Sequence, residues 1–198
     1  VYGPHVAMLY AREGWVQDQL ESLGHFFHPN DLEHKLGLAA ANYEAVQAIS
    51  EIVEYLGGEG SGGSFEQIAA HEEGLAEVLL GYLRGRGDVV ILGEKESNSA
   101  KRVPTVSFLI EGKNSQEVVE TVERRSDFGF RWGHFYSKRL VEEVLKCGED
   151  GVIRVSMVHY NTGVFIHPYP VIIELTTECS EEEIRKFVKV LDETFPPS

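Results

Sequence analysis

Short apolar runs alternate with amphipathic segments along the second half of the chain. Residues 103–110 (VPTVSFLI) are rich in β-branched side chains and predict a strand. Asn114, with Glu117 three positions later, predicts a capped helix that runs to about Arg125. We expect further strands at 128–132 and 152–160, and further helices at 137–145 and 180–193. This alternation, with short connections, favours a sheet with helices packed on it.

The first half predicts two amphipathic helices and little other regular structure. Residues 6–10 (VAMLY) are a short apolar run and predict a buried strand, whereas residues 11–41 predict mainly loop with short helical pieces. Asn42 is the expected N-cap of the first helix, which has one apolar stripe made of Tyr43, Val46, Ile49, Val53 and Leu56.

The second of these helices is expected to begin at Ser64 and to end near Gly85. Gln67 completes a capping-box pattern with Ser64. Its expected buried face is made of Ile68, Leu75, Leu79, Tyr82 and Leu83. In the last helix of the chain, Ser180 and Glu183 form a second capping box, and two pairs have i, i+4 spacing: Glu181 with Arg185 and Glu182 with Lys186.

The composition is typical of a soluble globular chain, with 42% apolar and 25% charged residues. A net charge of −14 argues against a nucleic-acid partner, because binding to phosphates depends on Lys and Arg. No apolar run approaches the roughly 18 residues of a membrane span, so we expect no membrane partner. No secretory signal is visible, and Cys147 and Cys179 lack metal-ligand spacing. We therefore expect an intracellular protein, of the cytoplasm or an organelle matrix, with reduced thiols.

Two patterns have the form of ligand sites but lack the context that such sites need. Residues 57–63 (GGEGSGG) satisfy G-x-G-x-x-G. A dinucleotide site places this loop between a strand and a helix, whereas here it follows an amphipathic helix, so we expect a flexible connector. His25 and His28 have the spacing of half a metal site, but no third ligand stands nearby, and we expect no metal.

Arg154 is the strongest candidate for a functional side chain. It lies within a predicted strand of otherwise apolar character, where an unpaired charge is costly. A guanidinium can bind a carboxylate through two parallel hydrogen bonds, which suits recognition of an amino acid. The alternative is an internal ion pair with one of the 32 acidic residues of the chain. The residue pattern leaves both interpretations open.

Three segments of the chain form a set: residues 1–10 (VYGPHVAMLY), 131–136 (RWGHFY) and 154–162 (RVSMVHYNT). Together they resemble the C-terminal region of the cysteine desulfurase-like class V aminotransferases, which are pyridoxal phosphate (PLP) enzymes. The resemblance implies an α/β fold, the C-terminal part of a fold-type I PLP-dependent transferase. Residues 1–84 would then be a remnant of the large, PLP-binding domain with connecting helices, and residues 85–198 the small α/β domain.

The resemblance also implies roles for two arginines as substrate-binding residues. In the family, the Arg of an Arg-x-Ser-x-x-x-Tyr-Asn-Thr motif binds the substrate carboxylate, and Arg154 stands at that position with every fixed residue present. Arg131 opens the loop that carries the nucleophilic cysteine in desulfurases, with the pattern Arg-x-Gly-x-x-Cys. Tyr136 stands at the cysteine position, and a phenol cannot replace a thiolate in a persulfide relay. We therefore expect an aminotransferase, epimerase or lyase type of reaction on a small amino acid.

Other positions have less defined roles. His134 could act as an acid or base, or be a solvated loop histidine. Residues 71–72 (His-Glu) are expected to be a packing or surface pair. Ala40 stands where the family has a phosphate-binding Thr, so we assign no cofactor-binding residue. Residues 163–175 are an insertion relative to the family and could be a surface hairpin or translated non-coding sequence.

The resemblance finally sets an expectation for activity. The cofactor-binding lysine would stand one residue before Val1, so we expect the chain by itself to be inactive. An enzyme that contained it would use PLP and form a homodimer with active sites at the subunit interface. The alternative is a non-enzymatic pseudo-enzyme or interaction module that dimerises with a related chain.

Overall fold

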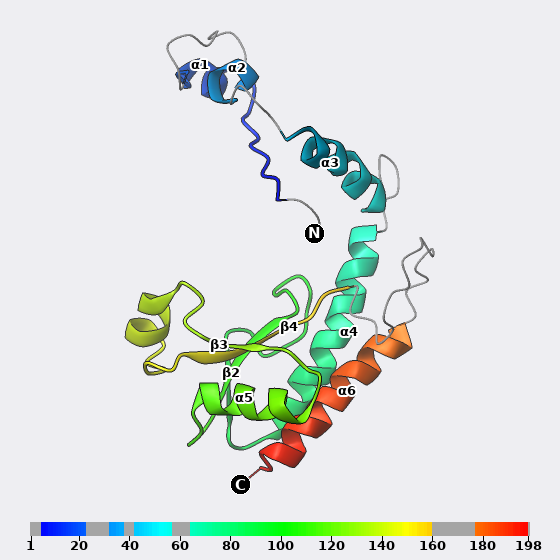
Figure 1. Ribbon diagram of the computed structural model, residues 1–198, viewed down its shortest axis with the longest axis vertical. Helices are drawn as coiled ribbons and strands as arrows, with labels where there is room; N and C mark the ends of the chain where they lie inside the picture. Colours follow the sequence, from blue (N-terminus) through cyan, green and yellow to red (C-terminus); the bar gives the residue numbers. More distant parts are fainter. Residues whose placement is uncertain (1–4, 23–31, 38–41, 57–63, 160–176, 198) are drawn as a thin grey trace. The chain divides into compact units, whose positions relative to one another are not determined.

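The computed structural model describes residues 5–22, 32–37, 42–56, 64–159 and 177–197 (Figure 1). The chain divides into two compact units, Val1–Phe65 and Glu66–Ser198. The sequence placed a boundary between residues 84 and 85 on the basis of family resemblance. That boundary separates a large-domain remnant from a small domain, and it stays a prediction.

The first unit begins with two short helices, α1 (Trp15–Gln19) and α2 (Leu32–Leu36). They confirm the expectation of short helical pieces between residues 11 and 41. The Lys35 ammonium joins the two helices, because its Nζ donates to the main-chain carbonyl of Gln17 at 2.7 Å. A charge-assisted hydrogen bond of this kind is stronger than one between neutral groups.

The third helix of the first unit, α3 (Tyr43–Tyr55), begins where the sequence predicts. Asn42 Oδ1 accepts a hydrogen bond from the Ala45 N–H at 2.9 Å and so satisfies one of the free donors of the first turn. The predicted apolar stripe is present, but Tyr43, Val46 and Val53 are exposed. Among the residues of α3, only Ala45 is buried.

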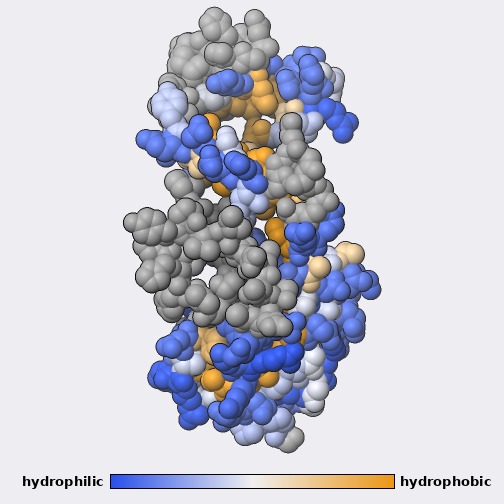
Figure 2. Space-filling view, turned by 90° about the vertical axis from the view of Figure 1, so that its right-hand side faces the viewer, coloured by the Kyte–Doolittle hydropathy of each residue, from blue (hydrophilic) through white to orange (hydrophobic). Residues whose placement is uncertain are grey.

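The strand predicted at residues 6–10 is wrong. The chain has no regular secondary structure from residue 5 to residue 12, and Met8, Leu9 and Tyr10 are largely exposed. A strand is stable only when its N–H and C=O groups pair with a neighbouring strand, and the described part of the first unit contains no such neighbour. Figure 2 shows apolar side chains open to view on this unit.

Within the described residues of the second unit, four strands form one antiparallel sheet in the order β1-β2-β4-β3. The strands are β1 (Val89–Leu92), β2 (Thr105–Ile110), β3 (Arg131–Gly133) and β4 (Val152–Ser156). The main helices of this unit are α4 (Ser64–Gly85), α5 (Ser115–Arg125) and α6 (Thr177–Thr194). Their apolar side chains share one core with the sheet. Figure 1 shows the helices and the strands of this unit. This arrangement confirms the expected sheet with helices packed on it.

Alternation along the strands separates the core from the opposite face of the sheet. On β2, Val106, Phe108 and Ile110 are buried in the core, and the residues between them are half-buried. On β4, the core residues Ile153 and Val155 flank Arg154, which therefore lies on the opposite face. The predicted buried face of α4 is confirmed for Leu75, Leu79 and Leu83, whereas Ile68 and Tyr82 are half-buried.

Several element boundaries differ from the predictions. Strand β1 was not predicted. Strand β2 begins at Thr105 rather than at Val103, which is exposed and precedes Pro104. Strand β3 is shorter than predicted, and the helix expected at 137–145 includes a π-helical turn, η1 (Leu140–Val144). A strand ends where its partner strand ends, and local propensity does not report that position.

The helices α5 and α6 form largely as the sequence predicts. Asn114 Oδ1 accepts from the Glu117 N–H at 3.1 Å and caps α5. Helix α6 begins at Thr177, three residues before the predicted start, and the Ser180 side chain lies outside the described part of the chain. Both predicted i, i+4 ion pairs are present, at 3.0 Å for Glu181 with Arg185 and 2.6 Å for Glu182 with Lys186.

A buried ion pair lies where α4, β1 and α6 meet. The Arg86 and Asp88 side chains are only 2% and 10% exposed, and two parallel hydrogen bonds of 2.8 and 2.6 Å join them. Arg86 Nη1 also donates to the Tyr82 hydroxyl and to the main-chain carbonyl of Phe195, both at 2.7 Å. The Tyr82 hydroxyl donates in turn to Asp192 at 3.1 Å. The network therefore ties the connection between α4 and β1 to Tyr82 of α4, to Asp192 of α6 and to Phe195.

We predict that Arg86→Ala lowers the free energy of unfolding by about 3–5 kcal/mol, because the Asp88 carboxylate would stay buried without its cation. The matched control is Arg84→Ala, which removes a more exposed ion pair with Glu77 at the end of the same helix. An exposed pair of this kind contributes about 0–1 kcal/mol. Urea unfolding followed by circular dichroism measures both changes. Equal losses for the two variants would contradict the prediction.

The same pair gives a pH signature. The hydrogen bonds from Arg86 hold the pKa of Asp88 below its usual value. The stabilisation from Asp88 is therefore fully present above the ordinary carboxyl pKa of about 4 and is lost as the pH falls through the lower pKa of the folded state. The stability difference between the unsubstituted chain and Asp88→Asn should shrink on acidification below about pH 4.

We predict that the chain self-associates through the exposed apolar side chains of the first unit, which include Val46 and Val53 on α3. Exposed apolar surfaces of this kind mark interaction sites. The double substitution Val46→Glu and Val53→Glu on α3 should weaken the association, whereas Val103→Glu, at an exposed valine of the other unit, should not. Sedimentation velocity over a range of concentrations measures this. A concentration-independent monomer for the unsubstituted chain would contradict the prediction.

Candidate functional site

A pocket of about 420 Å³ opens on the face of the sheet opposite the helical core. Three strands and the segment between β3 and β4 supply its walls. The lining residues are Leu92, Gly93, Ser107, His134, Phe135, Ser137, Leu140, Val141, Leu145, Val152 and Arg154. Two of the residues singled out in the sequence, Arg154 and His134, therefore face the same cavity.

The floor of the pocket is a row of side chains that the strand register brings together. Leu92 on β1 is the register partner of Ser107 on β2, and Ser107 is the register partner of Arg154 on β4. Directly opposite residues of antiparallel strands project from the same face of the sheet. The row therefore places the Arg154 guanidinium on the same face of the sheet as the Ser107 hydroxyl and the apolar side chain of Leu92.

Arg154 has a cation–π partner but no anionic partner in the described part of the chain. Its guanidinium carbon lies 4.0 Å from the centre of the Phe135 ring. Its Nε is buried and has no hydrogen-bond acceptor among the described residues. No described carboxylate forms an ion pair with it. Of the two interpretations that the sequence left open, the internal ion pair thus has no partner in this part of the chain.

The Phe135 ring reaches Arg154 because the backbone turns sharply after β3. Gly133 has a φ of 124°, and Phe135 and Tyr136 have φ values of 50° and 60°. A residue other than glycine in this left-handed region costs roughly 1–2 kcal/mol. Strain of this kind concentrates at binding and catalytic sites, where the surrounding structure holds it. The turn places Phe135 over the guanidinium and leaves Tyr136 fully exposed.

His134 lies in the wall of the pocket beside an acidic residue of η1. Its Nε2 is 3.0 Å from Glu142 Oε1, and the Lys138 ammonium is 3.5 Å from the same oxygen. The two atoms do not form a hydrogen bond, and the contact is an ion pair only when the imidazole is protonated. This arrangement can hold a proton at Nε2, next to the cavity.

The structure does not bring Arg131 to the pocket. Its guanidinium is mostly exposed and donates to Glu123 Oε1 on α5 at 3.1 Å and to the carbonyl of Phe130 at 2.8 Å. Arg131 is the register partner of Arg154, and the ion pair with Glu123 offsets the repulsion between two nearby cations. Its role as a second substrate-binding residue stays a prediction.

A close backbone contact fixes the position of β4, and therefore of Arg154, relative to the turn after β3. Gly151 has a φ of 74°, and a Cβ atom there would collide with the main chain of Gly133. Only glycine allows this approach. The Ser115 side chain, buried at the start of α5, donates to the Gly151 carbonyl at 3.1 Å and holds the same segment.

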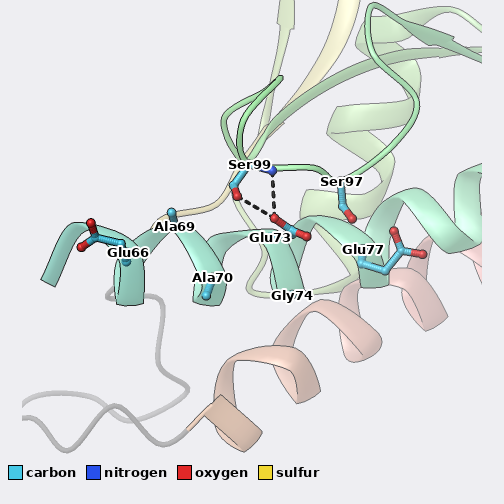
Figure 3. Close-up of a pocket in the computed structure, with 8 residues that line it drawn as sticks. All are labelled: Glu66, Ala69, Ala70, Glu73, Gly74, Glu77, Ser97 and Ser99. Atoms are coloured by element: carbon cyan, nitrogen blue, oxygen red, sulfur yellow. Dashed lines mark hydrogen bonds between the residues drawn. The ribbon is translucent and has the colours of Figure 1, made fainter. Parts of the chain in front are cut away.

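A second hollow, of about 540 Å³, lies between α4 and the loop that follows β1 (Figure 3). Glu73 is at its centre and accepts hydrogen bonds from the N–H and hydroxyl of Ser99 at 2.9 and 2.6 Å. These bonds hold the pKa of Glu73 below its usual value. Because Glu66 and Glu77 also line this hollow, its charge is negative and unsuited to a phosphate or carboxylate.

The remaining sequence candidates lie apart from the pocket or outside the described residues. Glu72 accepts from the His159 N–H at 3.2 Å, so Glu72 of the His71–Glu72 pair joins α4 to the segment that follows β4. Burial lowers the pKa of His71. The described residues contain no group of three acidic, His or Cys side chains placed to hold a metal ion, and no helix among them is long and apolar enough to cross a membrane. The candidates outside the described residues are His25, His28, Ala40, residues 1–4 and 160–162 of the motifs that carry the resemblance, and segments 57–63 and 163–175.

Sequence reasoning missed most of the pocket wall. Leu92 and Gly93 belong to the unpredicted β1, although Val-Val-Ile-Leu followed by glycine is typical of a strand and turn. Phe135 lies within the quoted segment 131–136, but its contact with Arg154 depends on two positive φ values. The apolar residues of η1 gave no signal beyond that of an ordinary amphipathic helix.

A family model described as aminotransferase class V matches residues 22–164. Because this match covers well over half of the chain, the chain belongs to the class V aminotransferase family. The resemblance drawn from the sequence motifs is thereby confirmed. The matched region includes every residue that lines the Arg154 pocket.

Two curated relatives show how much of such a protein the chain represents. It is 51% identical over 163 residues to the aminotransferase-like protein FGM3 of Gibberella zeae, and the aligned region covers 82% of this chain and 40% of FGM3. It is 32% identical over 196 residues to the cysteine desulfurase-like protein ustD of Aspergillus flavus, and the aligned region covers 98% of this chain and 40% of ustD. The chain thus spans about 40% of the length of these relatives.

Among solved structures, the chain is similar to the cysteine desulfurase CsdA of Escherichia coli. The TM-score is 0.60 at 15% identity, and the similarity covers 88% of this chain and 38% of CsdA. At this identity the likeness concerns the fold alone. It confirms the expected fold class, part of a fold-type I PLP-dependent transferase.

We predict that Gly151→Ala destabilises the chain by about 1–3 kcal/mol more than Gly148→Ala, because only the first substitution forces a steric overlap. Both glycines have positive φ values, of 74° and 83°, so the conformational cost of alanine is similar. A Cβ at Gly148 meets only the Asp150 carboxylate, at 3.5 Å. Urea unfolding gives both values, and equal losses would show that the approach of Gly151 to Gly133 can relax.

Proposed function

We propose that the chain supplies the substrate-carboxylate site of a PLP-dependent enzyme of the class V aminotransferase family that acts on a small amino acid. The observation that carries this proposal is Arg154, whose half-buried guanidinium faces a pocket without an anionic partner in the described residues. A buried cation requires an anion, and a carboxylate matches the guanidinium with two parallel hydrogen bonds. Arg154 stands at the family position with that role.

The described residues fit the substrate side of such a cofactor site. PLP, when bound, supplies an electron sink for reactions at the α-carbon of an amino acid. Arg154 would bind and orient the substrate carboxylate, and its unpartnered Nε is the observation that supports this fit. His134 would hold or accept a proton at Nε2 beside the same cavity. The groups that would hold the cofactor phosphate and ring are not assigned to any described residue.

Tyr136 supports a reaction other than sulfur transfer. It occupies the position at which desulfurases of the family carry the nucleophilic cysteine, and its phenol is fully exposed. The described cysteine, Cys147, lies outside the pocket lining, and burial raises the pKa of its thiol, which disfavours the reactive thiolate. We therefore propose an aminotransferase, epimerase or lyase type of reaction, carried out by a homodimer as the family resemblance implies.

A second candidate function is that of a non-enzymatic module that dimerises with a related chain. The exposed apolar stripe of α3 favours it, because large exposed apolar surfaces mark protein interfaces. The two functions differ in what they require of Arg154, since only the enzyme requires a guanidinium that binds a substrate.

We predict that Arg154→Ala, in a form of the protein extended to the length of its relatives, weakens amino-acid binding by roughly 10- to 150-fold. This factor corresponds to the loss of a charge-assisted hydrogen bond of about 1.5–3 kcal/mol. Arg154→Lys should recover only part of the affinity, because an ammonium cannot form the two parallel bonds. Spectroscopic titration of the PLP-loaded protein measures substrate affinity and cofactor loading separately, and loading should stay nearly unchanged.

The matched control for this experiment is Arg139→Ala, which removes an exposed guanidinium of the following segment that pairs with Glu143. It should alter neither substrate affinity nor stability. If Arg154→Ala instead kept normal affinity and lowered thermal stability, Arg154 would be a structural residue and the proposed clamp would be wrong.

A further inference from the structure

We propose that the Arg154 pocket is selective for carboxylates that carry an apolar body, so that the substrates are amino acids with aliphatic or aromatic side chains. This inference rests on the proposed role of Arg154 as the carboxylate ligand. It adds a selectivity for apolar ligands that neither the family nor the relatives' names assign. The evidence for it is the set of side chains that line the pocket.

The side chains around Arg154 are mainly apolar. Six of the lining residues are Leu92, Phe135, Leu140, Val141, Leu145 and Val152, and none of the described residues that line the pocket is acidic. This absence contrasts with the net charge of −14 of the chain. A carboxylate that enters the pocket therefore meets one guanidinium and no acidic side chain among the described residues of the wall, while the rest of the ligand meets mainly hydrocarbon.

The size of the cavity indicates a body larger than the carboxylate itself. A volume of about 420 Å³ lies within the range of pockets that hold organic ligands. A carboxylate alone would occupy a minor part of it. Leu140 and Leu145 of the wall are 50% and 39% exposed, so apolar surface is available for a ligand to cover. Burial of that surface against hydrocarbon favours ligands with an apolar body.

Phe135 allows the Arg154 guanidinium and the apolar wall to bind one ligand at the same time. The Arg154 guanidinium carbon lies over the Phe135 ring, 4.0 Å from the ring centre. A phenyl ring has no hydrogen-bond acceptor like that of a carboxylate, and the Arg154 Nε keeps its donor free of any acceptor among the described residues, so a carboxylate can bind the same guanidinium. The positive φ of Phe135 holds the ring in this place, where it is also part of the apolar wall.

The test uses the 198-residue chain and the straight-chain carboxylates acetate, butanoate and hexanoate, with hexanol as the ligand that lacks a charge. Each ligand is titrated by NMR chemical-shift perturbation, and circular dichroism confirms that every variant is folded. Affinity should rise about 4-fold per methylene, which corresponds to about 0.8 kcal/mol. Hexanol should bind more weakly than hexanoate.

Two substitutions on the same π-helical turn provide a matched pair. Leu140→Asn places a polar group in the apolar wall and should reduce the gain per methylene. Val144→Asn changes a residue that is exposed and outside the wall, and should leave the gain unchanged. Arg154→Ala should weaken the binding of all three carboxylates by the same factor, without changing the increase in affinity per methylene.

The outcomes separate this inference from the proposed function. Affinities that depend on Arg154 but not on ligand length would overturn the apolar selectivity and leave the carboxylate clamp intact. Affinities that rise with length but do not depend on Arg154 would overturn the clamp and, with it, the shared site. Equal effects of Leu140→Asn and Val144→Asn would show that the apolar body binds elsewhere, and no binding of hexanoate would overturn the inference outright.

Discussion

The buried pair of Arg86 and Asp88 connects the parts of the second unit on which the pocket depends. Its two hydrogen bonds fix the short connection between α4 and β1, and the same guanidinium donates to the carbonyl of Phe195 after α6. Strand β1 pairs with β2, and β2 carries the row that leads to Arg154. A buried charge without its partner is costly, so these elements are held in one arrangement.

Two arginines in the same unit illustrate how environment separates structure from function. Arg86 has acceptors for each of its nitrogen groups, in a carboxylate, a hydroxyl and a carbonyl. Arg154 has its guanidinium carbon over an aromatic ring and a buried Nε without an acceptor among the described residues. The hydrogen-bonding groups of the first guanidinium are satisfied within the fold, whereas the second is the one that we propose binds the carboxylate of a substrate. The family role assigned to Arg154 agrees with this difference.

Local sequence signals predicted the helices well and the strands less well. Asn42 and Asn114 cap helices as predicted, because a cap and the donors it satisfies lie within three residues of each other. Residues 6–10 and 89–92 are both short apolar runs, yet only the second is a strand. The difference is the presence of a pairing partner. The partner of residues 89–92 is β2, and neither the local propensity nor the periodicity of an apolar run reports whether it has a partner.

The sequence by itself determined the family, the helix starts and the identity of Arg154 as the residue of interest, because motifs and caps are written in neighbouring residues. Tertiary structure alone decided that Arg154 has no acidic partner in the described chain, that Arg131 turns to Glu123, and that Phe135 covers the guanidinium. These outcomes depend on the strand register and on the left-handed turn after β3. They follow from contacts between residues far apart in sequence, which no local pattern encodes.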